Sequence, residues 1–219
     1  MIEKKTLSFL TALKKNNNKP WFDSHKEQYL AAKENVEAFI GDLLPELCRF
    51  DPALKDLKAK DCIFRIYRDV RFAKDKRPYK TNMGASISAG GKKSSGPGYY
   101  LHIEPGKAFL AGGIWMPEGD QLRKIRQEID YNSKEIKKIL ADKTFKKYYG
   151  GFDESYKLKT TPKGYAKDHP EIELLKLTSY IVYHEYNNKE ILSKNFVKEI
   201  AKGAKIMKPV LDFLATAIS

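Results

Sequence analysis

The sequence has few cysteines and no long hydrophobic run. Of its 219 residues only Cys48 and Cys62 are cysteines, which is too few for a disulfide framework, and their spacing does not match a metal site. No stretch approaches the roughly 18 consecutive apolar residues of a membrane-spanning helix, and no apolar stretch follows the N-terminus as a signal peptide would require. We therefore expect a cytoplasmic protein with reduced thiols and no membrane partner.

Several signatures of catalysis and cofactor binding are also missing. There is no Gly-rich phosphate loop of the P-loop or dinucleotide type and no Gly-x-Ser-x-Gly elbow for a serine nucleophile. The sequence holds four scattered histidines without ligand spacing, His25, His102, His169 and His184, so no metal site is predicted. Motifs alone therefore identify neither a cofactor nor a reaction.

Acidic residues are outnumbered, with 28 Asp and Glu against 41 Lys and Arg and a net charge of +13. The excess is local, because residues 61–115 carry ten basic and four acidic side chains while the flanking segments are nearly balanced. A general nucleic-acid coat would spread its charge evenly or gather it in a tail. The distribution favours a discrete site for an anion.

The hydrophobic period changes from helical to alternating and back along the chain. Helical spacing predicts a first helix over 2–13, a second that starts at Asp23 or Ser24 and is kinked or divided by Pro45, two short helices after Pro117, and two more over 189–201 and 209–217. Alternation predicts strands over 62–72, 83–89, 99–104, 107–115 and 177–186. We expect one α+β domain over residues 1–219, with a central antiparallel sheet covered by N-terminal and C-terminal helices.

Pro105-Gly106 marks a hairpin between two of these strands. If Glu104 pairs with Lys107, one strand face is apolar and gathers Tyr99, Leu101, Ile103, Ala108, Leu110, Gly112 and Ile114. The opposite face then gathers Tyr100, His102, Glu104, Phe109, Ala111, Gly113 and Trp115. The first face is predicted to lie on the core.

The richest basic segment spans residues 62–80. Read as a strand, it places Arg68 on the apolar face, where an unpaired guanidinium is costly, so we expect a bulge or an anionic partner there. The segment carries seven cations, Arg65, Arg68, Arg71, Lys74, Lys76, Arg77 and Lys80, against Asp69 and Asp75. Arginine can hold a phosphate or carboxylate with two parallel hydrogen bonds, so several converging arginines would make an oxyanion pocket. The alternative is that they pair with neighbouring carboxylates.

A second candidate is the face that carries Tyr100, His102 and Trp115. An aromatic floor beside a histidine can stack a base or sugar ring, and His102 is the best candidate for proton transfer near neutral pH. The alternative is a face covered by a helix, with His102 as a satisfied core histidine. The face also carries small residues, Gly84, Ser86, Ala111 and Gly113, which leave room for a ligand or for a closely packed helix.

These residues resemble a known family, the Domain of Unknown Function 2461 proteins. The resemblance rests on Trp21-Phe22, the string from Arg65 to Phe72 with Lys74 to Lys80 after it, Gly98 to His102, Gly112 to Trp115, and Pro162 to Tyr165 with Asp168 to Pro170. It covers essentially the whole chain. The resemblance implies one full-length domain and brings no activity, cofactor or catalytic residue.

Three functions follow as hypotheses. In the first, Arg65, Arg68 and Arg71, with help from Lys74, Lys80, Tyr100, His102 and Trp115, bind a phosphorylated or carboxylated small molecule. In the second, the same basic patch binds nucleic acid, with Tyr and Trp as stacking platforms. In the third, the arginines form an internal network with carboxylates in a structural or adaptor protein. Convergence of the arginines on open space separates the first from the third.

Overall fold

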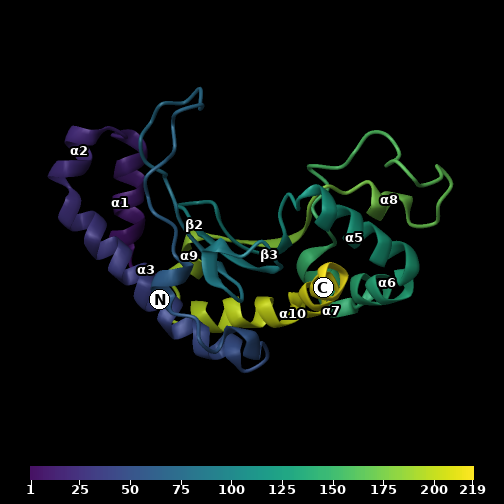
Figure 1. Cartoon of the computed structure of the whole chain (residues 1–219). Helices are drawn as coiled ribbons and strands as arrows, with labels where there is room; N and C mark the ends of the chain where they lie inside the picture. Colours follow the sequence, from purple (N-terminus) through teal and green to yellow (C-terminus); the bar gives the residue numbers. More distant parts are fainter.

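The computed structural model describes residues 1–219 and opens with three helices (Figure 1). They are α1 (Lys4–Lys15), α2 (Lys19–Ser24) and α3 (Lys26–Cys48). The predicted second helix is α3, but its predicted cap at Asp23 or Ser24 is wrong, because both residues lie in the additional short helix α2 and α3 begins after His25. Asn18 caps α2, since its side chain accepts a hydrogen bond from the Trp21 amide at 3.0 Å. This short turn buries Phe22 and lays Trp21 against the core.

Proline does not interrupt the two longest helices. Pro45 lies inside α3, and Pro209 lies inside α10 (Phe196–Ile218). The predicted break between 201 and 209 is therefore wrong. The missing amide donor costs α10 a hydrogen bond, but its buried stripe continues on both sides of the proline, from Ala204 and Met207 to Val210. Tertiary packing outweighs the local preference.

The middle of the chain forms a four-stranded antiparallel sheet in the order β1-β2-β3-β4. The strands are β1 (Met83–Ile87), β2 (Gly98–Ile103), β3 (Ala108–Ile114) and β4 (Tyr180–Tyr186). The predicted hairpin register is confirmed: Leu101 faces Leu110 and His102 faces Phe109, and the Lys107 amide donates to the Glu104 carbonyl at 3.1 Å across the turn.

The remaining helices are shorter and lie before the sheet, between its strands or directly after it. They are α4 (Ala59–Cys62), α5 (Gly119–Tyr131), α6 (Ser133–Ala141), α7 (Lys143–Tyr149), α8 (Ile172–Leu175) and α9 (Asn188–Ile191), with short 3₁₀ turns at Pro52–Leu54 and Gly91–Lys93. The predicted break between two short helices after Pro117 is confirmed at Asn132, where α5 ends. No helix has the length and apolar character needed to cross a membrane.

One face of the sheet is buried and the other is open. The predicted core face is buried, with Tyr99, Leu101 and Leu110 at about 1% exposure, and α10 runs along it (Figure 1). Gly112 permits this close approach, since a Cβ there would lie 2.0 Å from the Met207 sulfur. No helix packs on the opposite face, so the alternative of a helix-covered aromatic face is wrong.

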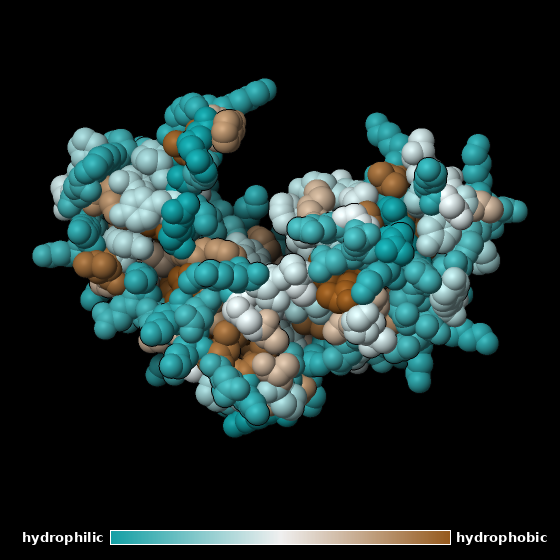
Figure 2. Space-filling view, in the orientation of Figure 1, coloured by the Kyte–Doolittle hydropathy of each residue, from teal (hydrophilic) through white to brown (hydrophobic).

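Two segments rise beside this open face. One is the basic segment after α4, here called the arm (residues 63–82), and the other is the loop of residues 150–171, which stands on the far side of the sheet (Figure 1). The space-filling view shows the molecule hollowed between the two lobes that they belong to (Figure 2). The fold thus presents a concave surface whose floor is the open face of the sheet.

Candidate functional site

The arm is not the strand that its alternation predicts. It joins the sheet only at its base, where the Phe64 amide donates to the Gly84 carbonyl at 3.0 Å. It then pairs with itself: the Arg68 amide donates to the Pro78 carbonyl at 2.9 Å, and the Lys80 amide to the Ile66 carbonyl at 2.8 Å. Beyond this ladder Phe72 is 95% exposed, although in a strand over 62–72 it would share the apolar face with Phe64. The segment is a projecting hairpin-like arm.

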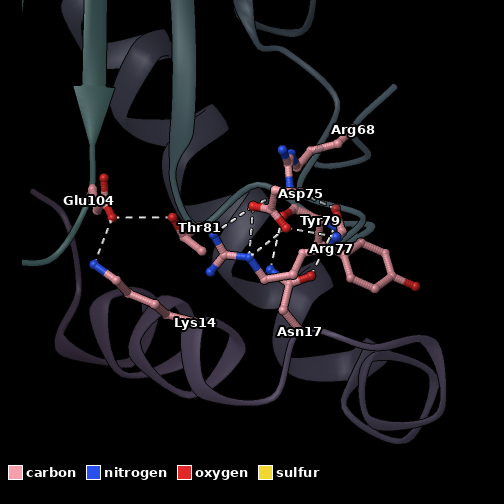
Figure 3. A network of polar contacts seen from close by, with 8 residues as sticks. All are labelled: Lys14, Asn17, Arg68, Asp75, Arg77, Tyr79, Thr81 and Glu104. Atoms are coloured by element: carbon pink, nitrogen blue, oxygen red, sulfur yellow. Dashed lines mark hydrogen bonds and ion pairs between the residues drawn. The ribbon is translucent and has the colours of Figure 1, made fainter. Parts of the chain in front are cut away.

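Aspartates of the arm already bind two of the three predicted arginines. Arg71 forms a bidentate pair with Asp69, with its closest contact at 2.6 Å. Arg68 contacts Asp75 at 3.0 Å, and Arg77 contacts the same carboxylate at 2.7 Å (Figure 3). Hydrogen bonds from Arg77, joined by Arg68, hold the pKa of Asp75 well below its usual range. The predicted convergence of Arg65, Arg68 and Arg71 on open space is therefore not observed.

Arg65 and Lys80 differ from these pairs, because neither side chain has a hydrogen-bond or ion-pair partner. The Lys80 ammonium lies 5.2 Å from the centre of the Phe64 ring, in a cation–π contact. Burial, and then the charge of Arg65, lower the pKa of Lys80. Two cations that repel each other and form no ion pair attract an anion. They stand at the base of the arm, beside the sheet.

A groove of about 850 Å³ lies over the open face. Its lining is rich in aromatic residues, among them Phe64, Tyr100, Phe109, Trp115, Tyr156 and Tyr183. Small residues alternate with them, among them Ser86, Ala111 and Gly113, and the loop after β1 contributes Lys92, Ser94 and Ser95. Trp115 is 59% exposed at one end. The groove therefore combines flat apolar surfaces with hydroxyl groups and a few charges.

A polar chain runs along β2 at one side of this groove. The Tyr100 hydroxyl lies 3.1 Å from His102 Nδ1, and His102 Nε2 lies 3.2 Å from a Glu104 oxygen. The three residues alternate along one strand, so their side chains point to the same face. The imidazole stacks on Phe109 at 4.6 Å between ring centres. Only Tyr100 of the three lines the groove.

The outer oxygen of Glu104 is anchored from two other elements. Lys14 of α1 donates to it at 3.3 Å, and the Thr81 hydroxyl donates at 3.2 Å (Figure 3). Burial alone would raise the pKa of the Glu104 carboxyl, but the bonds from His102, Lys14 and Thr81 outweigh it, and the pKa lies below its usual value. Burial lowers the pKa of His102, partly offset by Glu104. At neutral pH the pair is a carboxylate and a neutral imidazole.

The structure thus separates the predicted site residues into two groups. Tyr100, His102 and Trp115 lie on the open face, with Lys80 at its edge through Phe64. Arg71 and Lys74 lie far out on the arm and are exposed. Sequence reasoning missed Tyr156, Tyr183 and Asn82. For Tyr183 a signal existed, since its alternation with buried Val182 in the last strand places it on the opposite face.

The fold and the groove define an α+β protein whose antiparallel meander has one face covered by helices and one open, aromatic face. The chain belongs to the family of conserved hypothetical proteins DUF2461, whose model matches residues 5–213. This confirms the resemblance carried by the Arg-rich string. No curated protein and no solved structure matches the chain.

Proposed function

We propose that this protein binds, in the groove on the open sheet face, a small molecule that carries a ring and a phosphate or carboxylate group. The observation that carries the proposal is the uncovered aromatic floor. Its volume of about 850 Å³ falls in the range of roughly 300–1,000 Å³ typical of small-molecule sites. Planar rings stack favourably on Tyr, Phe and Trp faces, which supports a base or a sugar ring as the apolar part of the ligand.

The anionic part of the ligand is argued from charge. Arg65 and Lys80 have no carboxylate partner, and Lys80 is half-buried against Phe64, which itself lines the groove. The groove itself is lined by two lysines and two carboxylates, so the unpaired positive charge lies with Arg65 and Lys80. An anion beside these two cations would offset the burial and the Arg65 charge that lower the Lys80 pKa. The arginines that are already paired have no direct part in this proposal.

The test is a thermal-shift screen with inorganic phosphate, sugar phosphates, nucleoside monophosphates and small carboxylates. A ligand present at 100 times its Kd stabilises the fold by about 2.7 kcal/mol, which raises Tm by roughly 5–10 °C for a chain of this size. Ring-bearing phosphates should stabilise more than inorganic phosphate. A set in which no compound raises Tm would contradict the proposal.

Two variants locate the binding. Ala111→Phe fills the floor between Tyr100 and Tyr183 and should abolish the thermal shift. Lys80→Gln should lower the affinity for the ligand about tenfold or more. Lys74→Gln is the matched control, because it removes the same charge from the exposed arm. Equal losses in Lys80→Gln and Lys74→Gln would mean that the site does not lie at the base of the arm.

A single-stranded nucleic acid is the second candidate, and Phe72 favours it. This ring is 95% exposed on a basic arm, with the Arg71 guanidinium 5.9 Å from its centre, and stacking of bases on exposed aromatics is the usual mode of sequence-tolerant binding. Affinity for a short oligonucleotide should then fall steeply with salt and fall further in Phe72→Ala. An affinity that does not respond to salt would exclude this candidate.

A further inference from the structure

Tyr100, His102 and Glu104 are arranged as a hydroxyl, a base and a residue that orients the base. Glu104 is ionised, so it accepts a hydrogen bond from His102 Nε2–H at 3.2 Å. The neutral ring then carries its only proton on Nε2, and Nδ1 is left as an acceptor. The Tyr100 hydroxyl, at 3.1 Å, is placed to donate to it.

Asn82 adds a further donor beside the imidazole. Its amide nitrogen lies 3.3 Å from His102 Nδ1, so that nitrogen has two donors within reach, the Asn82 amide and the Tyr100 hydroxyl. Burial holds the pKa of Tyr100 above its usual value and that of His102 below it, so the proton rests on the tyrosine, and His102 Nδ1 is the acceptor placed to receive it.

The support behind the base is rigid. The second oxygen of Glu104 is held by Lys14 and Thr81, and Phe109 stacks on the imidazole with an interplanar angle of 9°. Gly84, which faces His102 across β1 and β2, leaves the space that the Tyr100 hydroxyl occupies. These contacts define the position of the hydroxyl beside His102, and the Tyr100 residue that carries it lines the groove.

We propose that Tyr100 is a catalytic nucleophile of the groove, with His102 as its general base and Glu104 as a positioning residue, acting on a phosphoester. The proposal rests on the proposed function, since the groove must first bind the phosphorylated ligand. Tyrosine is among the side chains that form covalent intermediates when a neighbouring base activates them.

The reaction has two balanced steps. In the first, the Tyr100 oxygen forms a bond to phosphorus, its proton passes to His102 Nδ1, the bond from phosphorus to the leaving oxygen breaks, and the imidazolium gives the proton to that oxygen. In the second, water attacks the phosphotyrosine, His102 takes the water proton, the bond from phosphorus to the Tyr100 oxygen breaks, and the proton returns to Tyr100. Glu104 stabilises the imidazolium in both steps.

The experiment uses benzenesulfonyl fluoride, whose ring suits the aromatic floor, and follows labelling by peptide mass spectrometry. The tyrosine oxygen bonds to sulfur, fluoride leaves, and His102 takes the proton. Tyr131 is the internal control, because it is 72% exposed and far more accessible than half-buried Tyr100. At pH 7 Tyr100 should react at least tenfold faster than Tyr131. Labelling that follows exposure alone overturns the proposal in the wild-type protein, without any variant.

Two substitutions and a pH series separate a relay from a structural network. His102→Gln should slow Tyr100 labelling at least tenfold and leave Tyr131 unchanged; Glu104→Gln should slow it less, with partial rescue in Glu104→Asp. Above the His102 pKa the Tyr100 rate should be flat, whereas the Tyr131 rate rises about tenfold per pH unit. The groups that face His102 are Tyr100, Glu104, Lys107, Asn82 and Phe109, with Lys14 behind Glu104. A Tyr100 rate that parallels Tyr131 across the series overturns the relay.

The two proposals fail in distinguishable ways. Tyr100→Phe keeps the aromatic floor, so it should retain the thermal shift of a stabilising phosphorylated ligand while losing the labelled peptide. Absence of any thermal shift in wild type contradicts binding, whatever the labelling. A thermal shift with no preferential labelling contradicts the nucleophile and leaves the binding site in place.

Discussion

Gly84→Ala links the geometry of the sheet to the reactivity of the groove. A Cβ at this position would lie 2.6 Å from the Tyr100 oxygen and 3.1 Å from two ring carbons, and these contacts must lengthen to about 3.4 Å. The far end of the side chain can retreat into the groove, so the backbone keeps its place. The retreat breaks the 3.1 Å contact with His102, and loss of one such hydrogen bond costs about 1 kcal/mol.

The assay is thermal unfolding combined with the sulfonyl fluoride labelling described above. A cost of about 1 kcal/mol lowers Tm by roughly 2–4 °C, and the labelling rate of Tyr100 should fall toward that of Tyr131. Gly119→Ala is the matched control, because a Cβ there meets nothing within 4 Å; its Tm should not fall.

A double-mutant cycle identifies the cause. In a Tyr100→Phe background the oxygen is absent, so Gly84→Ala should cost less, although the ring carbons at 3.1 Å keep the cost above zero. An equal loss of stability in both backgrounds would refute the reasoning, since Gly84 would then matter for its backbone and not for the hydroxyl.

Three further predictions concern stability and thiol reactivity. At pH 8 a thiol reagent should modify Cys48 ahead of Cys62, because burial raises the pKa of the Cys62 thiol to about 11 and leaves it fully covered; faster modification of Cys62 in the native protein would show that its site opens. Gly113→Ala should cost about 3 kcal/mol or more, measured by urea unfolding, since φ is +128° and a Cβ would lie 1.9 Å from the Tyr180 carbonyl oxygen; a Tm loss as small as that of Gly84→Ala would contradict this. Arg71→Ala should leave Tm unchanged, because the side chain is 77% exposed and its ion pair is screened by solvent; a clear loss would indicate an unrecognised structural role for the arm.

The sheet was predictable because its hairpin has a strict period of two. Each residue on the apolar face of β2 and β3 alternates with a polar, aromatic or small one, and a shift by one residue would bury His102 and expose Leu101. One register satisfies both strands, and the structure confirms it. The same pattern predicted which side chains share the open face, and hence three of the residues that line up along β2.

The arm was not predictable by the same rule. Its alternation from Cys62 to Phe72 resembles that of a strand, but after Phe64 the backbone pairs only with the arm's own return segment. Ile66 near the base of the arm is still buried, but the tip has no second layer to cover it, and Phe72 is exposed. Alternation predicts the direction of the side chains. Strand pairing depends on which other segment lies beside the backbone, and the local sequence does not determine that segment.

The arginine string and the open face illustrate different limits. Arg71 lies two residues from Asp69 in the sequence, close enough to form an ion pair with it. A count of charges cannot distinguish an arginine paired in this way from one that is free to bind an anionic ligand. The groove is open because α10 packs on the aliphatic face of the sheet and no helix packs on the aromatic face. The composition of the aromatic face alone would also be compatible with a second covering helix.

The open face is stable without a covering helix because its aromatic rings cover one another. The centre of the Phe109 ring lies 4.6–6.2 Å from the ring centres of His102, Tyr100 and Tyr183. Much of its apolar surface is therefore removed from water within the sheet itself. Smaller residues between the rings then leave a groove instead of a cavity that would collapse. A face built in this way keeps Tyr100 on the groove while the side chains of His102 and Glu104 stay almost dry, at 14% and 12% exposure. The low exposure strengthens the hydrogen bonds between them, and in the proposed mechanism Tyr100 is the member of the three that meets the ligand.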